Sequence, residues 1–100
     1  MEKEKMIPAS EFCHSHQIEL TVLHSFRNYE LVELSVIEEE LFIPYKELPL
    51  LEKLLRMHVD LGINFEGIET ILHLLERMKV MQQHAEALRN KLLFYESQPG

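Results

Sequence analysis

The stretch HVDLGINFEGIETILHLLERM, residues 58–78, carries two glycines five positions apart in a chain rich in helix-forming residues. Gly62 follows an apolar helical pattern that ends at about residue 60 or 61, and a glycine there is typical of a left-handed helix stop, since it has no Cβ. Asn64 is a good N-cap for a new helix, which makes Gly67 its third helical residue. Because glycine inside a helix costs up to ~1 kcal/mol relative to alanine, we expect Gly67 to permit a close approach to a neighbouring helix.

The segments upstream of this joint combine a helix with a hairpin. The helix that ends at Gly62 is predicted to begin near Pro49, because proline suits a first helical turn. Its apolar residues are Leu50, Leu51, Leu54, Leu55 and Met57. From residue 31 to 43 the pattern changes to two apolar runs around three glutamates, which predicts a two-stranded hairpin with the acids at or near its tip. The apolar residues of the hairpin are Val32, Leu34, Val36, Leu41, Phe42 and Ile43.

Two short helices are predicted before the hairpin. After an extended entry at residues 6–8, Ser10 can cap a helix that begins at Glu11 and is anchored by Phe12. A break near residues 16–17 leads to a second helix, over roughly residues 19–29. The apolar residues on one face of this second helix are Leu20, Leu23 and Phe26.

The last predicted helix has no internal glycine or proline from residue 68 to 98. One apolar stripe, Ile68, Leu72 and Leu75, is confined to its first turns and can pack on the N-terminal part. A second stripe recurs at spacings of three and four over more than three heptads, the a/d pattern of a coiled coil. Since so small a body cannot cover it, we expect a homodimer; a helix folded back on its own body is the alternative. The predicted dimer interface is Ile71, Leu74, Met78, Met81, Ala85, Leu88, Leu92 and Tyr95.

The net charge of −7 is concentrated in the first part of the chain. Residues 1–40 hold nine acids against three bases, a balance of −6, whereas residues 41–100 hold eight against seven, a balance of −1. Between Ile7 and Tyr45 the only Lys or Arg is Arg27. A polyanion such as nucleic acid is therefore a poor partner for this half.

The remaining composition favours a cytoplasmic protein. No apolar run approaches the ~18 residues of a membrane span, so we expect no membrane association. Residues 1–6 mix charges and have no apolar stretch behind them, unlike a signal peptide. The single cysteine, Cys13, suits a reducing compartment.

The histidines and the cysteine give only a weak metal signal. Cys13, His14 and His16, with His24 nearby, are soft ligands, but adjacent Cys13 and His14 point to different helix faces, and a cysteine beside an anchoring phenylalanine is commonly buried and inert. His58, His73 and His84 lack the i, i+4 spacing that puts two imidazoles on one face. No nucleophile–base pair, phosphate loop or carboxylate couple is identifiable. We therefore expect no metal, no cofactor, no small-molecule substrate and no enzymatic activity.

The order of these elements resembles the MerR-like winged helix-turn-helix superfamily. Leu61, Gly62 and Ile68 match the joint of that superfamily, whereas Ile63 stands where its DNA-binding branch usually has an aromatic residue. The chain resembles more closely the chaperone-modulator family CbpM. That likeness is carried by the hairpin followed by a helix and by two motifs, Glu11-Phe12-Cys13 and His58-x-x-Leu61-x-Ile63-Asn64-Phe65-x-Gly67-Ile68.

The resemblance implies a mainly α fold: a winged helix-turn-helix body with a small β-hairpin wing over residues 1–66, and a long C-terminal coiled-coil helix over 67–100. It also implies a regulator that binds the J-domain of a DnaJ- or CbpA-type co-chaperone and inhibits its action with Hsp70. The alternative is a MerR-type DNA-binding transcriptional regulator. A third interpretation is a purely structural coiled-coil subunit. The sparse cations of the predicted second helix and wing favour a protein partner, because a DNA reader needs them to neutralise phosphates.

Three surfaces are alternative candidates for the docking site of a basic partner helix. The first is the hairpin tip with Glu38, Glu39 and Glu40, although such a run is also typical of a solvated turn. The second is Glu30 and Glu33. The third is the helix joint near His58 and Asp60, where His58 is also suited to a hydrogen bond across the joint. The sequence does not decide among them.

Overall fold

The computed structural model of the chain describes residues 5–97. The charged start interpreted as no signal peptide, residues 1–6, lies partly outside these residues. The last three residues of the predicted coiled-coil segment, 98–100, lie wholly outside them. The chain divides into two compact units, Met1–Glu69 and Thr70–Gly100. The division falls inside the last helix, so the first turn of that helix belongs to the N-terminal unit.

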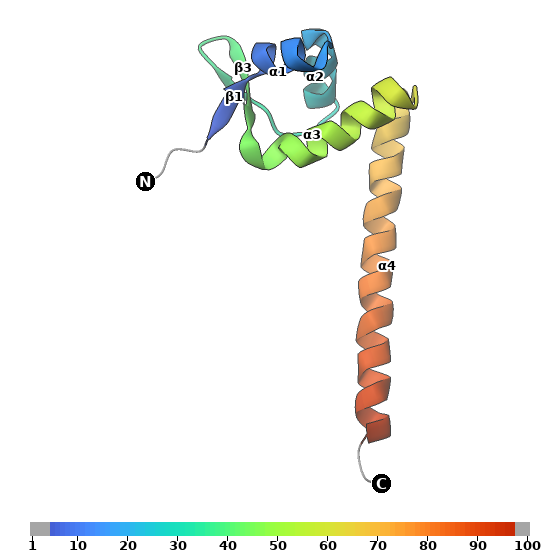
Figure 1. Cartoon of the computed structure of the whole chain (residues 1–100). Coiled ribbons are helices and arrows are strands. Elements are labelled where there is room, and N and C mark those ends of the chain that lie inside the picture. The colour runs from blue at the N-terminus through green and yellow to red at the C-terminus, as the bar shows by residue number, and fades with distance from the viewer. Residues whose placement is uncertain (1–4, 98–100) are drawn as a thin grey trace. The chain divides into compact units, whose positions relative to one another are not determined.

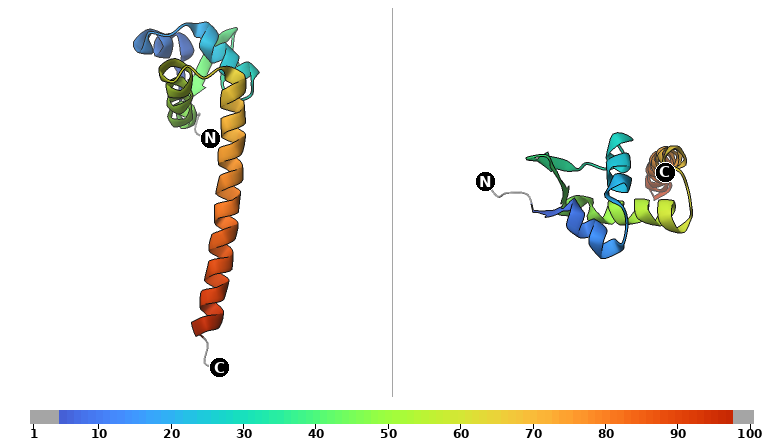
Figure 2. Two further views of the ribbon diagram at one scale, coloured as in Figure 1. Left: turned by 90° about the vertical axis from the view of Figure 1, so that its right-hand side faces the viewer. Right: turned by 90° about the horizontal axis from the view of Figure 1, so that it is seen from above.

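The N-terminal unit contains a small sheet and three helices before the last one begins (Figure 1). The elements in order are β1 (Met6–Pro8), α1 (Ala9–His16), α2 (Leu20–Asn28), β2 (Ser35–Ile37), β3 (Glu40–Pro44), a 3₁₀ turn (Tyr45–Glu47), α3 (Leu48–Leu55), a π-helical turn (Arg56–Asp60) and α4 (Phe65–Ser97). The β2–β3 hairpin projects as a wing beside the helices (Figure 2). The mainly helical winged helix-turn-helix fold predicted from the sequence is confirmed.

The sheet has the order β1-β3-β2 and is antiparallel throughout. Ile7 pairs with Ile43 across β1 and β3, so the extended entry of the chain is a strand of the sheet. Ile43 is fully buried, whereas Val36 and Ile37 of the edge strand β2 are each 49% exposed. The wing is therefore anchored through β3, and its outer strand displays apolar side chains to solvent.

The core of the unit lies where α1, α2 and α3 meet the sheet. Its largest fully buried side chains are Phe26, Leu23, Ile43, Leu51, Leu54 and Ile68. Phe12 is buried, as predicted for the anchor of α1. Fully burying an apolar side chain of this size contributes about 1.5–3 kcal/mol, so these residues hold the helix-turn-helix and the wing in fixed positions.

Two details of the predicted N-terminal part are wrong. The first helix begins at Ala9, after Pro8 in an extended conformation, and Ser10 makes no cap. Residues 31–34 form no strand; Leu31, Val32 and Leu34 are buried in an irregular segment that follows a left-handed turn at Glu30 (φ 58°). Leu20, which shares the predicted apolar face with Leu23 and Phe26, is 38% exposed. In each case the tertiary packing of the segment overrides its local pattern.

The joint at Gly62 is confirmed, with one difference at Gly67. Gly62 has a φ of 66°, and the Asn64 side chain accepts a hydrogen bond from the Gly67 backbone N–H at 2.7 Å. A Cβ on Gly67 would lie 2.8 Å from both Asn64 Oδ1 and Ile63 Cγ2. The close approach is therefore to the helix's own cap, and the expectation of a neighbouring helix is wrong.

Candidate functional site

The surface between α2 and the wing is where a winged helix-turn-helix protein would read DNA. A hollow there is bordered by Leu20 and His24 of α2 and by Val36, Glu39 and Glu40 of the hairpin. Leu20 and Val36 are 38% and 49% exposed. The only Lys or Arg from α1 to the end of β3 is Arg27 of α2. The surface is thus apolar and acidic, which suits a protein partner better than a phosphate backbone.

The predicted acidic tip divides between a turn and a strand. Ile37 pairs with Glu40, so Glu38 and Glu39 alone form a two-residue turn. Both have a positive φ, 51° and 66°, as in a type I′ turn. Glu40 is the first residue of β3, and all three glutamates are exposed.

The other predicted contact residues lie at two further places. Glu30 and Glu33 lie on the irregular segment after α2. They line one hollow together with Arg27 of α2. Asp60 is exposed at the end of the π-helical turn. The structure therefore does not gather the seven predicted contact residues into one site.

His58 holds the helix joint. Its Nδ1 donates a hydrogen bond to the Ile63 carbonyl oxygen at 2.9 Å, which is the bond across the joint to which His58 is suited. The ring stacks on Phe65, with centroids 4.4 Å apart, and meets the edge of Phe26 at 6.0 Å. A half-buried histidine with these contacts fixes the geometry of the joint.

Two aromatic contacts beside the joint were not predicted from the sequence. Tyr29 stacks on Phe65 at 5.5 Å, and its hydroxyl donates a 2.5 Å hydrogen bond to the Glu66 carboxylate. That hydrogen bond lowers the pKa of Glu66 and raises the pKa of Tyr29. In the sequence, the only indication of this aromatic cluster is that His58 and Phe65 stand on either side of the helix stop at Gly62.

Cys13 and the nearby histidines do not converge. Cys13 is buried, which raises the pKa of its thiol. His16 instead donates from Nδ1 to the Phe12 carbonyl oxygen at 3.0 Å and stacks on the Phe12 ring at 4.0 Å. Within residues 5–97 no three His, Cys, Asp or Glu side chains are grouped so that they could hold a metal ion.

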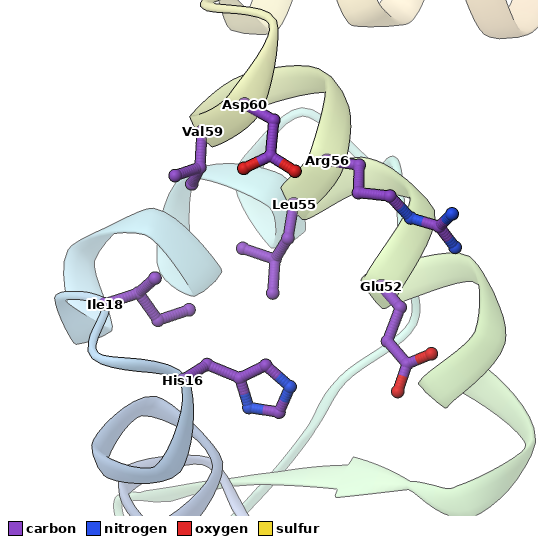
Figure 3. A pocket seen from close by; sticks show the side chains of 7 residues that line it. All are labelled: His16, Ile18, Glu52, Leu55, Arg56, Val59 and Asp60. Atoms are coloured by element: carbon purple, nitrogen blue, oxygen red, sulfur yellow. The ribbon is translucent and has the colours of Figure 1, made fainter.

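A second hollow lies between the α1–α2 turn and the end of α3 (Figure 3). Leu55 and Ile18 point into it from opposite sides, and the carboxylate of Asp60 lies at its margin. The Arg56 guanidinium points away from it. Sequence reasoning missed this hollow because its lining residues come from two segments, residues 16–18 and 52–60, that are far apart in the sequence.

The predicted dimer stripe on α4 is largely exposed in the single chain. Leu74, Leu88 and Leu92 are 50%, 60% and 58% exposed, and Met78, Met81 and Tyr95 are each more than 60% exposed. By contrast, Ile68 in the first turn is fully buried. Among the helices that the structure describes, none is long and apolar enough to cross a membrane.

Comparison with known proteins gives one match. The family model described as MerR HTH family regulatory protein matches residues 7–90, from β1 well into α4. No curated protein and no solved structure matches the chain.

Proposed function

The chain belongs to the MerR HTH family of regulatory proteins, and we propose that it regulates by binding another protein rather than DNA. Its partner in this proposal is the J-domain of a DnaJ- or CbpA-type co-chaperone, whose action with Hsp70 it inhibits. The protein acts without catalysis, in the cytoplasm, and as a homodimer through α4.

The observation that carries the proposal is the chemistry of the α2–wing surface. A DNA reader of this fold places cations on the second helix and the wing, because about half or more of its hydrogen bonds go to the DNA backbone. Here that surface combines the exposed apolar Leu20 and Val36 with Glu38, Glu39 and Glu40. Three carboxylates repel phosphate, so the surface with which this fold would read DNA opposes a DNA partner.

The choice of a J-domain rests on the likeness of residues 58–68 to the chaperone-modulator family. In that family the partner domain carries a basic helix that docks on Hsp70. An acidic regulator is electrostatically complementary to such a helix, which accelerates encounter and disfavours wrong partners. Occupying the basic helix would prevent its use by Hsp70.

The second candidate is a DNA-binding transcriptional regulator. The family match and the winged helix-turn-helix fold favour it, since both are common to DNA-binding regulators. Fold alone does not determine function, however, and the charge distribution opposes this candidate.

The test is a direct binding measurement with an isolated J-domain, followed by an Hsp70 ATPase assay. We expect binding that weakens as salt is raised, and loss of the J-domain's stimulation of the ATPase when this protein is added. A random pool of duplex DNA serves as the second ligand under the same conditions. Binding to DNA without binding to the J-domain would reject the proposal in favour of the second candidate.

A further inference from the structure

One long side of α3 borders two adjoining hollows. The first lies toward the C-terminal end of α3 and is lined by Ile18, Leu55 and Val59, among others (Figure 3). The second lies toward its N-terminal end and is lined by Ile7, Phe12 and Leu48, among others. Both are lined by His16 and Glu52. The two hollows therefore adjoin at these side chains, and together they are here named the α1–α3 groove.

The length of the α1–α3 groove suits a helix as its occupant. It follows α3 and the π-helical turn from Leu48 to Asp60. Twelve residue steps at about 1.5 Å each span about 18 Å, which is the length of about three helical turns. Binding of an amphipathic helix in an apolar groove is a recurrent mode of recognition.

The lining of the groove is apolar at its base and acidic at its margins. Phe12 and Leu55 are buried there, whereas Val59 is 54% exposed. The margins carry three carboxylates, from Glu11, Glu52 and Asp60. Arg56 is the only Lys or Arg in the lining of these hollows, and its guanidinium points outward in Figure 3. An occupant with one apolar face and flanking cations would complement both features.

The π-helical turn shapes one end of this groove. The Leu61 N–H bonds to the Arg56 carbonyl oxygen at 3.0 Å, five residues back. Such turns are rare and are frequent at functional sites. Here the turn contributes Val59 and Asp60, one apolar and one acidic side chain, to the same hollow.

We propose that the α1–α3 groove is the docking site for a basic amphipathic helix of about three turns from the partner protein. This inference rests on the proposed function, because the basic helix of a J-domain is the occupant to which it commits. It assigns the contact to Glu52, Val59 and Asp60 and not to the hairpin tip.

A charge-matched pair of variants tests the assignment. Glu52→Lys with Asp60→Lys reverses two charges in the groove, and Glu38→Lys with Glu39→Lys reverses two on the wing. All four positions are exposed, so both variants retain the fold, as circular dichroism would verify. With an isolated J-domain, the groove variant weakens affinity by about tenfold or more, and the wing variant by less than about threefold.

The outcomes separate this inference from the proposed function. A wild-type chain that binds no J-domain overturns the function and the groove together. Wild-type binding that the groove variant retains in full overturns the groove alone. A loss confined to the wing variant transfers the site to the hairpin tip and also overturns the groove.

An apolar pair tests the helix-binding mode independently of charge. Val59→Ser removes an apolar contact inside the groove, whereas Leu61→Ser removes a 70% exposed leucine that lies outside its lining. We expect Val59→Ser to weaken J-domain binding about fivefold to tenfold, and Leu61→Ser to leave it unchanged. Equal effects of the two substitutions would contradict an occupant seated in the groove.

Discussion

At the scale of single residues, the two glycines of the joint serve different purposes. Gly62 adopts a φ of 66°, and nothing lies within 4 Å of where its Cβ would be. Gly67 has no such backbone requirement, but its missing Cβ leaves room for the Asn64 cap. The first glycine is needed for conformation and the second for space.

Substitution of Gly62 tests the conformational requirement. Gly62→Ala would place a Cβ in the left-handed region without any clash, so we expect unfolding to become easier by about 1–2 kcal/mol. Gly62→Asn should cost less, because asparagine tolerates that region. Chemical denaturation of the three proteins provides the measurement. Wild-type stability in Gly62→Ala would show that the helix stop does not depend on glycine.

His58 is the second residue on which the joint depends. His58→Ala removes the hydrogen bond to Ile63 and the stacking on Phe65, and should lower the free energy of unfolding by about 2 kcal/mol. The exposed His73 of α4 offers a matched control, since His73→Ala should change stability by less than about 0.5 kcal/mol. Thermal or chemical unfolding of both variants distinguishes a structural histidine from a surface one.

At the scale of elements, the wing combines a well-anchored strand with a turn of unfavourable sequence. Pairing to β1 and β2 holds β3 on both sides, with Ile43 fully buried. The turn nevertheless places two glutamates at positive φ, where asparagine and glycine are usually found. Folding of this hairpin is thus driven by packing of its strands and is opposed locally by its turn.

Replacing the turn sequence should stabilise the wing. Glu38→Asn with Glu39→Gly supplies the preferred type I′ pair and removes two neighbouring negative charges, so we expect a gain of about 1–2 kcal/mol in unfolding free energy. The measurement is chemical denaturation. A loss of stability would mean that the glutamates make contacts that compensate for their backbone conformation.

At the scale of the whole molecule, the acidic N-terminal half and the exposed stripe of α4 dominate. The −6 balance of residues 1–40 includes α1, α2 and the residues of the wing tip. The stripe on α4 exposes leucines and methionines over several turns. The first feature disfavours polyanionic partners, and the second is an exposed apolar surface of the kind found at interaction sites.

The charge balance predicts negligible binding to duplex DNA. The first half of the chain has few Lys or Arg side chains that could displace counterions from the DNA phosphates. At about 0.15 M salt we therefore expect no mobility shift of duplex DNA at micromolar protein. A shift with micromolar affinity under these conditions would contradict the prediction and favour a transcriptional role.

The α4 stripe predicts a dimer. Leu74→Lys with Leu88→Lys would place charges in the dry seam of a coiled coil and should yield monomers. Sedimentation of wild type and variant at tens of micromolar gives the comparison. A monomeric wild type would show that the stripe has another partner.

The sequence by itself determined the order of the elements, the joint and the long helix. Gly62 and Asn64 are local signals, because a left-handed stop and an N-cap depend on the residue and its immediate neighbours. The wing followed from two apolar runs around the glutamates, and the acidity of the first half was a direct count. These features could be predicted because they are read along the chain, from neighbouring residues, periodicity or composition, and need no contact between distant segments.

The tertiary structure alone decided where the pieces meet. Pairing of β1 with β3, burial of Leu31, Val32 and Leu34 without a strand, and the cluster of His58, Phe65 and Tyr29 all depend on contacts with other segments of the chain. The α1–α3 groove is of the same kind, since its lining combines β1, α1, the following turn and α3. Periodicity reports which face of a helix is apolar, but only packing decides which apolar residues are covered and which remain open to a partner.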